Sequence, residues 1–185
     1  MLYGLVETTD NNPLVCADTF SVPSPAGTLG ALALAPLFWA GIVAEQPILV
    51  LHAPEAESRE WDALFGPDAV DVRYETTTVE GLYMGLAMAV VSWNLEDGPV
   101  SGLYDEAFGR SFFVERSIGP LKPELVLGKA KAVYTLKQTS DGDKSLLTIQ
   151  VIADKNGKCG AAQVVHALNV MAGYEESLGT ELVTL

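Results

Sequence analysis

The stretch VPSPAGTLGALALAPLFWAGIV, residues 22–43, decides the fold, because its prolines and its apolar run fix where one helix begins and where that helix must lie. The segment Val22-Pro23-Ser24-Pro25 cannot lie inside a helix, since each proline restricts its own backbone and that of the residue before it. We therefore predict a helix that begins just after this segment, bends near Pro36 and ends at about Ala44. No charged residue occurs from Thr19 to Ala44, so the helix is expected to be buried on nearly all sides.

An uncharged run of this length also has to be tested as a membrane-spanning helix and as a signal peptide. It is rich in Ala and Gly, contains Pro36 and has no flanking Lys or Arg, which disfavours a membrane span. A signal peptide needs a basic start, and the first cation of the chain is Arg59. We expect a cytoplasmic protein that does not bind membranes. Its two cysteines, Cys16 and Cys159, fit reduced thiols, and they lack the clustering of a zinc site, so no metal is expected.

The charge of the chain is strongly acidic and unevenly distributed. The 185 residues fit one domain, and their net charge of −13 argues against nucleic acid as a partner. All seven lysines lie between Lys122 and Lys158, where four acids leave a local net charge of +3. An acidic surface with one Lys-rich hairpin explains this pattern. The alternative is an anion site or a partner patch near the Lys-rich segment.

Outside the apolar helix, hydrophobic periodicity predicts short helices and mostly antiparallel strands. The predicted helices are 55–65, 99–108 and 158–173, and the predicted strands are 47–52, 70–74, 82–93, 112–114, 130–137 and 146–152. Turn residues occupy 96–98 and 140–143. The pattern lacks strict alternation of strand and helix, so we predict a single α+β domain over 1–185.

Three details complete this prediction. Residues 1–18 look irregular because they are rich in turn residues. The last helix carries an apolar stripe and is closed by Gly173; the stripe consists of Val164, Val165, Leu168 and Met171. A group of acids on the helix over 55–65 is expected to form a solvated face; these acids are Glu55, Glu57, Glu60 and Asp62.

Three segments carry a family resemblance. Residues 21–42 contain Ser-Val-Pro-Ser-Pro-Ala-Gly-Thr, then Leu-Ala-Leu-Ala-Pro-Leu and Gly-Ile. Residues 103–114 contain Leu-Tyr-Asp-Glu-Ala-Phe and then Phe-Val. Residues 158–179 contain Lys-Cys-Gly-Ala-Ala-Gln and then Asn-Val-Met-Ala-Gly-Tyr-Glu-Glu-Ser-Leu-Gly. In this order they resemble the C-terminal, catalytic and dimerisation domain of the N-acetyl-γ-glutamyl-phosphate reductase and aspartate-semialdehyde dehydrogenase superfamily.

The resemblance implies a fold like the C-terminal domain of glyceraldehyde-3-phosphate dehydrogenase. That fold has a mixed, mostly antiparallel sheet with helices packed on one face. The chemistry of the superfamily needs a thiolate at a helix N-terminus, a His for proton transfer, cations for phosphate, and a nicotinamide dinucleotide. The resemblance therefore allows each of these requirements to be checked by position.

The residues at those positions do not supply this chemistry. The nucleophile aligns with Pro25, the segment of the family's His aligns near 74–81, which contains neither His nor Arg, and the substrate-side Arg aligns with Leu127. The chain also has no Gly-x-Gly-x-x-Gly dinucleotide fingerprint. The sequence thus resembles the second domain without the NAD(P)-binding domain and without the catalytic Cys and His. No cofactor is expected, and NADP enters only if a separate nucleotide-binding chain exists.

A few residues remain from the family's pocket or could replace its nucleophile. The resemblance leaves Ser24, Thr28, Lys158 and Gln163 as a remnant pocket. Cys159 and His166 are the substitute candidates, but seven helical residues separate them by about 10 Å along the axis, too far to bond directly. Cys159 is more simply a small buried residue at a tight turn.

Three functions compete on these observations. The leading hypothesis is a non-catalytic, semialdehyde-dehydrogenase-like domain that acts as a dimerising, partner-binding or regulatory module. The first alternative is one subunit of a split NADP-dependent semialdehyde dehydrogenase that needs a separate Rossmann chain. The second is a small-molecule sensor that uses the remnant pocket. A lone copy would uncover apolar surface, so we expect a homodimer or a higher oligomer, with a related dehydrogenase or nucleotide-binding subunit as the other possible partner.

Overall fold

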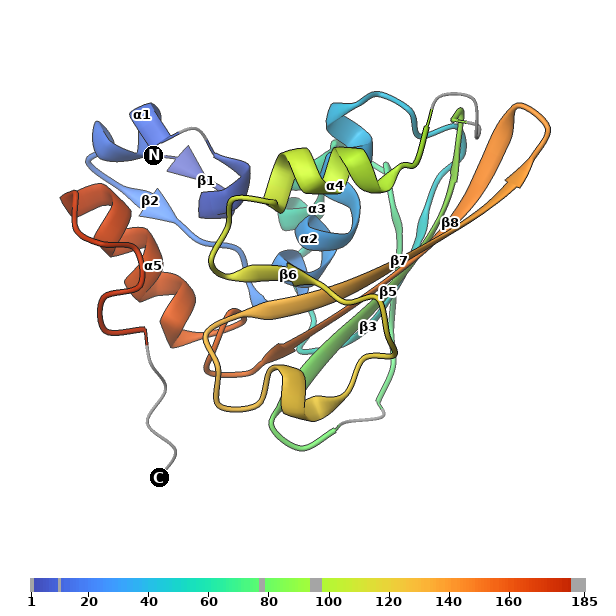
Figure 1. Cartoon of the computed structure of the whole chain (residues 1–185). Coiled ribbons are helices and arrows are strands. Elements are labelled where there is room, and N and C mark those ends of the chain that lie inside the picture. Colours follow the sequence, from blue (N-terminus) through green and yellow to red (C-terminus); the bar gives the residue numbers. More distant parts are fainter. Residues whose placement is uncertain (1, 10, 77–78, 94–97, 181–185) are drawn as a thin grey trace.

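A six-stranded sheet forms the frame of the molecule in the computed structural model, which describes residues 2–9, 11–76, 79–93 and 98–180 (Figure 1). The strand order is β4-β3-β5-β8-β7-β6. The pairs β3–β4 and β6–β7 are parallel and the other three are antiparallel. The strands are β3 (Ile48–His52), β4 (Asp71–Tyr74), β5 (Leu82–Val91), β6 (Val114–Arg116), β7 (Ala132–Asp141) and β8 (Lys144–Asp154). The predicted α+β class and the mixed, mostly antiparallel sheet are confirmed.

Helix α2 (Pro25–Trp39) forms the centre of the core, with α3 (Ser58–Phe65) and α4 (Ser101–Phe108) beside it on the same face of the sheet (Figure 1). Every residue of α2 from Ala26 to Leu37 is buried, as the uncharged sequence predicts. The Tyr104 hydroxyl of α4 donates a hydrogen bond to the Ala33 carbonyl at 2.5 Å, which fastens α4 to α2. No helix in the described part of the chain is long and apolar enough to cross a membrane.

The end of α2 differs from the prediction. The helix stops at Trp39, five residues before Ala44, because Gly41 adopts a left-handed backbone with φ of +65°. The chain then runs antiparallel to the end of β5, where Val43 pairs with Val91 and the Ala44 N–H donates to the Val90 carbonyl. These residues therefore extend the sheet instead of the helix.

Most of the predicted strands and turns agree with the structure to within a few residues. Strand β6 begins two residues later than predicted, at Val114, and β7 and β8 are longer than predicted. They form a hairpin whose two turn residues, Gly142 and Asp143, lie between the paired Asp141 and Lys144. The turn predicted over 96–98 falls mainly on residues 94–97, which lie outside the described residues.

The N-terminal segment has more structure than its turn-rich sequence suggests. It contains β1 (Leu2–Tyr3), the 3-10 helix η1 (Val6–Thr8) and α1 (Asn11–Val15). Strand β1 pairs in parallel with β2 (Phe20–Ser21), and α1 packs on the last helix, α5 (Ala161–Ala172). Long-range pairing of this kind has no local sequence signal, which is why the segment looked irregular.

Helix α5 is not buried along the apolar stripe of its sequence: Val164 and Leu168 are exposed, and Val165 and Met171 are only half-buried. An apolar stripe normally faces the core, but Val164 and Leu168 are 45% and 58% exposed. The buried face carries three polar side chains, Gln163, His166 and Asn169, beside three small or medium apolar ones, Ala162, Ala167 and Val170. The three polar side chains find hydrogen-bond partners inside the protein, which allows them to be buried and leaves the apolar stripe exposed or half-buried. The helix ends at Gly173 in the left-handed conformation, as predicted.

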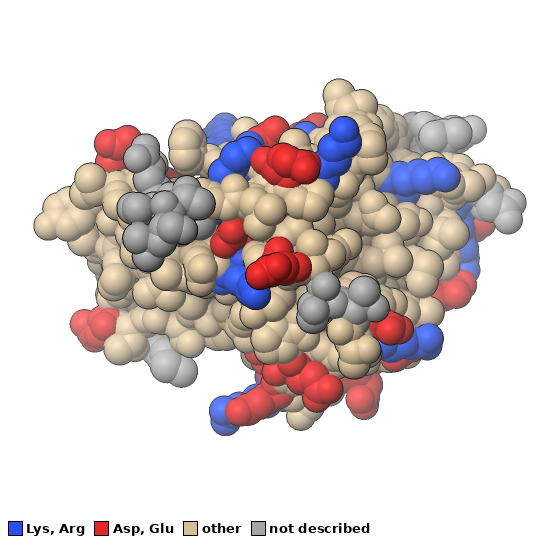
Figure 2. Space-filling view, turned by 90° about the horizontal axis from the view of Figure 1, so that it is seen from below, with Lys and Arg blue, Asp and Glu red and all other residues tan. Residues whose placement is uncertain are grey.

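The other face of the sheet is only partly covered, and it carries an apolar patch on β3, β5 and the start of β8, with polar side chains such as Arg73 and Gln150 on either side of the patch. Side chains alternate along a strand, so when Ala87, Ala89 and Val91 of β5 face α2, their neighbours face away from it. We call six side chains the open sheet face: Ile48, Val50, Leu86, Met88, Val90 and Leu146. Cross-strand pairs such as Ile48–Met88, Val50–Leu86 and Val90–Leu146 make this surface continuous. Seen from the side opposite α4, much of the surface is uncharged (Figure 2).

Candidate functional site

The N-terminus of α2 is the place where the resemblance puts the nucleophile. Ser24 caps the helix, and its Oγ accepts a hydrogen bond from the Gly27 N–H at 3.1 Å. Pro25 occupies the first helical turn, where proline is well tolerated because its missing N–H is not needed. The Ser24 N–H donates to Glu60 Oε1 of α3 at 2.7 Å. The protein's own groups thus accept hydrogen bonds from the Ser24 and Gly27 N–H groups at this end of the helix.

The Glu60 carboxylate lies directly over the helix N-terminus. Its Oε1 also accepts a hydrogen bond from the Tyr3 hydroxyl at 2.6 Å. Burial raises the pKa of Tyr3, and the hydrogen bond to Glu60 and the negative charge of Glu60 raise it further. A Cβ at Gly27 would lie 2.1 Å from Glu60 Oε1, so the close approach depends on glycine at that position. A negative charge is favourable there because the N-terminus of a helix is positive. Glu60 therefore does not belong to a purely solvated acidic face, as its sequence neighbours suggest.

Three of the predicted pocket residues lie together beneath this helix end. The Thr28 hydroxyl donates to Gln163 Oε1 at 3.1 Å, and Gln163 Nε2 donates to the Pro23 carbonyl at 3.2 Å. Thr28 and Gln163 are fully or almost fully buried. With Ser24, which caps the same helix, they join the start of α5 to the start of α2. These bonds hold α2 and α5 together. They use the Thr28 hydroxyl and the Gln163 amide, so neither group is directed at solvent.

Cys159 lies close to Pro25 but lacks the properties of a nucleophile. Its Sγ is 3.8 Å from the Pro25 carbonyl oxygen. Burial raises the pKa of the thiol to about 12, with Lys158 opposing that effect and Asp154 adding to it. A thiolate is the reactive form, so Cys159 stays protonated at neutral pH. Cys159 and His166 share no hydrogen bond in the part of the chain that the structure describes.

Lys158 points to a different group from the other pocket residues. Its Nζ donates to Glu7 Oε1 at 2.6 Å, and the two side chains are 1% and 4% exposed. The Ser111 hydroxyl donates to the same oxygen at 3.2 Å. His166 Nδ1 lies 3.8 Å from it, while His166 Nε2 is 3.1 Å from Glu176. We call Glu7, Lys158 and His166 the buried ionic cluster.

The protonation states within the buried ionic cluster follow from burial and charge. Burial by itself raises the pKa of Glu7, but the charge of Lys158, the charge of His166 when its ring is protonated at acid pH, and the hydrogen bond from Lys158 outweigh burial and lower that pKa. Burial and the charge of Lys158 lower the pKa of His166, against the opposing effects of Glu7 and Glu176. Glu7 is therefore ionised and His166 neutral at neutral pH. Glu7 Oε2 and His166 Nδ1 make no hydrogen bond among the described residues.

A hollow of about 710 Å³ opens beside Ser24, between the N-terminal segment and α3. Three glutamates and a single arginine line it: Glu55, Glu57, Glu60 and Arg59. This charge balance disfavours an anionic ligand. No cluster of three His, Cys, Asp or Glu side chains suited to a metal ion occurs within the described ranges.

The sequence did not identify Glu7 or Glu60 as site residues. Glu7 lies 151 positions from Lys158, and Glu60 lies 36 positions from Ser24. Neither pair has a local pattern that could have revealed it.

Comparison with known proteins supports the fold. No family model matches the sequence, and no curated protein matches it either. Among solved structures, aspartate semialdehyde dehydrogenase II from Vibrio cholerae complexed with ASA is similar, with a TM-score of 0.63 and 11% identity over 93% of this chain and 68% of that one. A second structure of aspartate semialdehyde dehydrogenase II from Vibrio cholerae is similar with a TM-score of 0.63 and 13% identity, over 92% of this chain and 68% of that one. At this identity the likeness shows the fold, which is that of a dehydrogenase C-terminal domain.

Proposed function

We propose that this chain is a non-catalytic relative of the semialdehyde dehydrogenases and acts as a dimerising, partner-binding module. The observation that carries this proposal is the state of the α2 N-terminus. Pro25 has no nucleophilic atom, and the Glu60 carboxylate lies over the helix end where a reacting anion would be attracted. Cys159, the nearest thiol, has its pKa raised to about 12 by burial.

Electrostatics explains why Glu60 matters for such chemistry. An acyl phosphate brought to the α2 N-terminus would meet the Glu60 carboxylate there. Two like charges 4 Å apart repel by about 4 kcal/mol at an effective dielectric constant near 20. The first 58 residues contain neither Lys nor Arg, so none of their side chains balances the negative charge of Glu60. The arrangement therefore supports a helix end that is covered by the protein's own carboxylate, which disfavours binding of an anionic substrate there.

The open sheet face supports the dimerising part of the proposal. Met88 and Leu146 are 36% and 46% exposed, and they belong to a continuous apolar surface on long, regular strands. Adjacent exposed apolar side chains favour an interface. A two-fold pairing of this face with a second copy would cover it. The outward stripe of α5, with Val164 and Leu168, supplies a second apolar surface for a different partner, such as a related dehydrogenase or nucleotide-binding subunit.

Sedimentation velocity at micromolar concentration tests the assembly. The wild type is expected to sediment as a dimer. Val90→Glu, on the open sheet face, is expected to give monomers, whereas Val164→Glu makes the same chemical change on α5 and is expected to leave the dimer intact. A monomeric wild type, or a dimer that Val164→Glu dissociates and Val90→Glu does not, would contradict the proposal.

A further inference from the structure

Strand β6 (Val114–Arg116) lies at the end of the sheet and has one unpaired edge. The Ala132 N–H donates to the Phe113 carbonyl at 2.9 Å, and the Ser117 N–H donates to the Tyr134 carbonyl at 2.8 Å. In a parallel pair the backbone groups of one strand point alternately toward and away from its partner. The N–H and C=O groups of Val114 and Arg116 therefore point away from β7; Arg116 is exposed, whereas Val114 is 6% exposed. Such an edge is a template for a further strand.

Exposed apolar side chains lie at both ends of this edge. Phe112, just before β6, is 73% exposed, and Ile118, just after it, is 99% exposed. They are the two most exposed of the large apolar side chains in the described part of the chain. Strand β6 is short and carries the exposed charges Glu115 and Arg116, which normally protect an edge strand from non-specific pairing. Bare apolar groups beside such an edge are unusual, so the combination favours a selective partner over general aggregation.

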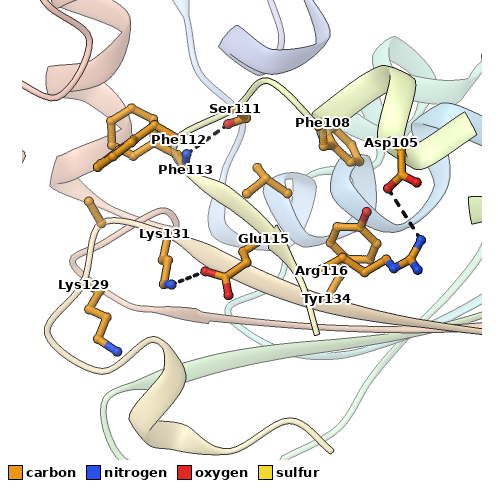
Figure 3. A pocket seen from close by; sticks show the side chains of 13 residues that line it. Asp105, Phe108, Ser111, Phe112, Phe113, Glu115, Arg116, Lys129, Lys131 and Tyr134 are labelled. Carbon is orange, nitrogen blue, oxygen red and sulfur yellow. Dashed lines mark hydrogen bonds and ion pairs between the residues drawn. The ribbon is translucent and has the colours of Figure 1, made fainter. Parts of the chain in front are cut away.

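Two hollows follow β6 from one end to the other. The first, of about 660 Å³, lies between α4, β6 and the start of β7, with Phe108 and Tyr134 in its wall (Figure 3). The second, of about 460 Å³, lies between the loop after β6 and residues on the side of β7 away from α4, including Thr135 and Lys137. Arg116 lines both hollows. An added strand would direct alternate side chains to the two faces of the sheet, and each face offers a hollow here.

The charges along this edge favour an acidic ligand. Four cations line the two hollows, Arg116, Lys129, Lys131 and Lys137, against Asp105 and Glu115, in a chain whose net charge is −13. Arg116 pairs with Asp105 at 3.5 Å, and Lys131 pairs with Glu115 (Figure 3). Both pairs are partly exposed, and pairs of this kind contribute little to stability. Their cations can therefore exchange partners with the carboxylates of a ligand.

We infer that β6 is the docking edge for an extended acidic segment of a partner protein, which adds a strand to the sheet. The segment's backbone pairs with Val114 and Arg116, its apolar side chains enter the hollows, and its carboxylates meet Arg116 and Lys131. This inference rests on the proposed partner-binding role and gives that role a specific surface. None of the six side chains of the open sheet face lines either hollow, and strand addition and dimerisation are measured by different experiments.

Fluorescence anisotropy with a labelled peptide tests this inference. The probe is Glu-Val-Glu-Phe-Glu-Val-Glu, compared with the same peptide carrying Lys for Glu and with a version whose alternate backbone nitrogens are methylated. The acidic peptide is expected to bind saturably at low salt, and both comparison peptides to bind at least tenfold more weakly. N-methylation removes hydrogen-bond donors without changing the side chains, so it isolates the backbone pairing.

Variants locate the binding site. Arg116→Glu is expected to weaken binding of the acidic peptide at least tenfold, whereas Arg73→Glu, on the opposite edge strand β4, changes it less than twofold. Arg116→Pro, which removes the outward N–H, is expected to bind more weakly than Arg116→Ala. Circular dichroism confirms that each variant is folded.

Equal binding of the N-methylated peptide, or equal losses at Arg116 and Arg73, would overturn the inference. So would the absence of saturable binding by a folded wild type. If that absence accompanied a normal dimer in sedimentation, strand addition would be refuted while the proposed dimerising role stood.

Discussion

Glu7→Gln is the sharpest stability test of the buried ionic cluster. Glu7 Oε1 is 2.6 Å from Lys158 Nζ and also accepts from Ser111, and the Lys158 side chain is 1% exposed. The substitution keeps the shape of the side chain and removes its charge, which leaves the Lys158 ammonium buried without a counter-ion. Breaking a buried pair in this way costs about 3–5 kcal/mol.

The melting temperature gives this cost a measurable scale. For a domain of about this length each kcal/mol corresponds to roughly 2–4 °C, so Glu7→Gln is expected to lower Tm by roughly 6–20 °C. The matched control is Glu115→Gln, whose partner Lys131 is 28% exposed. A surface pair contributes about 0–1 kcal/mol, so the control is expected to move Tm by no more than about 4 °C.

A double variant completes the test. Lys158→Met in the Glu7→Gln background removes the stranded charge, and it is expected to recover part of the lost stability. Urea unfolding followed by circular dichroism measures all the variants. The reasoning is refuted if Glu7→Gln costs no more than Glu115→Gln, or if adding Lys158→Met lowers stability further.

Three further predictions follow from the site. The pKa values of Glu7 and His166 are both lower in the folded state, so the protein is expected to lose stability on acidification. The loss begins at about pH 6.5 for His166 and at about pH 4.5 for Glu7. Urea midpoints measured from neutral to acid pH test this, and a protein that becomes more stable over that range would contradict it. Cys16 is exposed, whereas Cys159 is buried and its pKa is raised. A thiol reagent such as DTNB is therefore expected to modify one thiol per native chain quickly and the second only after unfolding. Two rapidly modified thiols in the native protein would be inconsistent with this. Gly27→Ala places a Cβ where Glu60 Oε1 lies, so it is expected to displace that flexible side chain from its hydrogen bonds at a cost of about 1 kcal/mol. The cost is expected to be smaller in a Glu60→Ser background. Equal costs in the two backgrounds would show that Glu60 does not occupy this position.

The local features of this fold could be predicted from the sequence. Periodicity and turn residues located α2, the β7–β8 hairpin and most other elements, because each depends on neighbours within a few positions. The orientation of α5 could not be predicted from its apolar stripe. Its buried side is decided by hydrogen bonds from Gln163 to Pro23, 140 positions away, and from Asn169 to the chain after the helix.

The candidate site, too, could be predicted from the sequence only in part. The resemblance pointed to Ser24, Thr28 and Gln163, and these residues meet at the starts of α2 and α5. Glu7 and Glu60 were missed because their roles depend on where the N-terminal segment and α3 lie relative to the core. A carboxylate placed by tertiary packing has the same sequence appearance as a solvated one, so only the structure distinguishes them.

The central claim is that a closed α2 N-terminus leaves this domain without dehydrogenase chemistry. The most direct test follows NADPH absorbance when the purified chain at micromolar concentration is incubated with aspartate semialdehyde, phosphate and NADP. The account predicts no turnover above that of a heat-denatured sample. Turnover that Cys159→Ser or His166→Gln abolishes would contradict it.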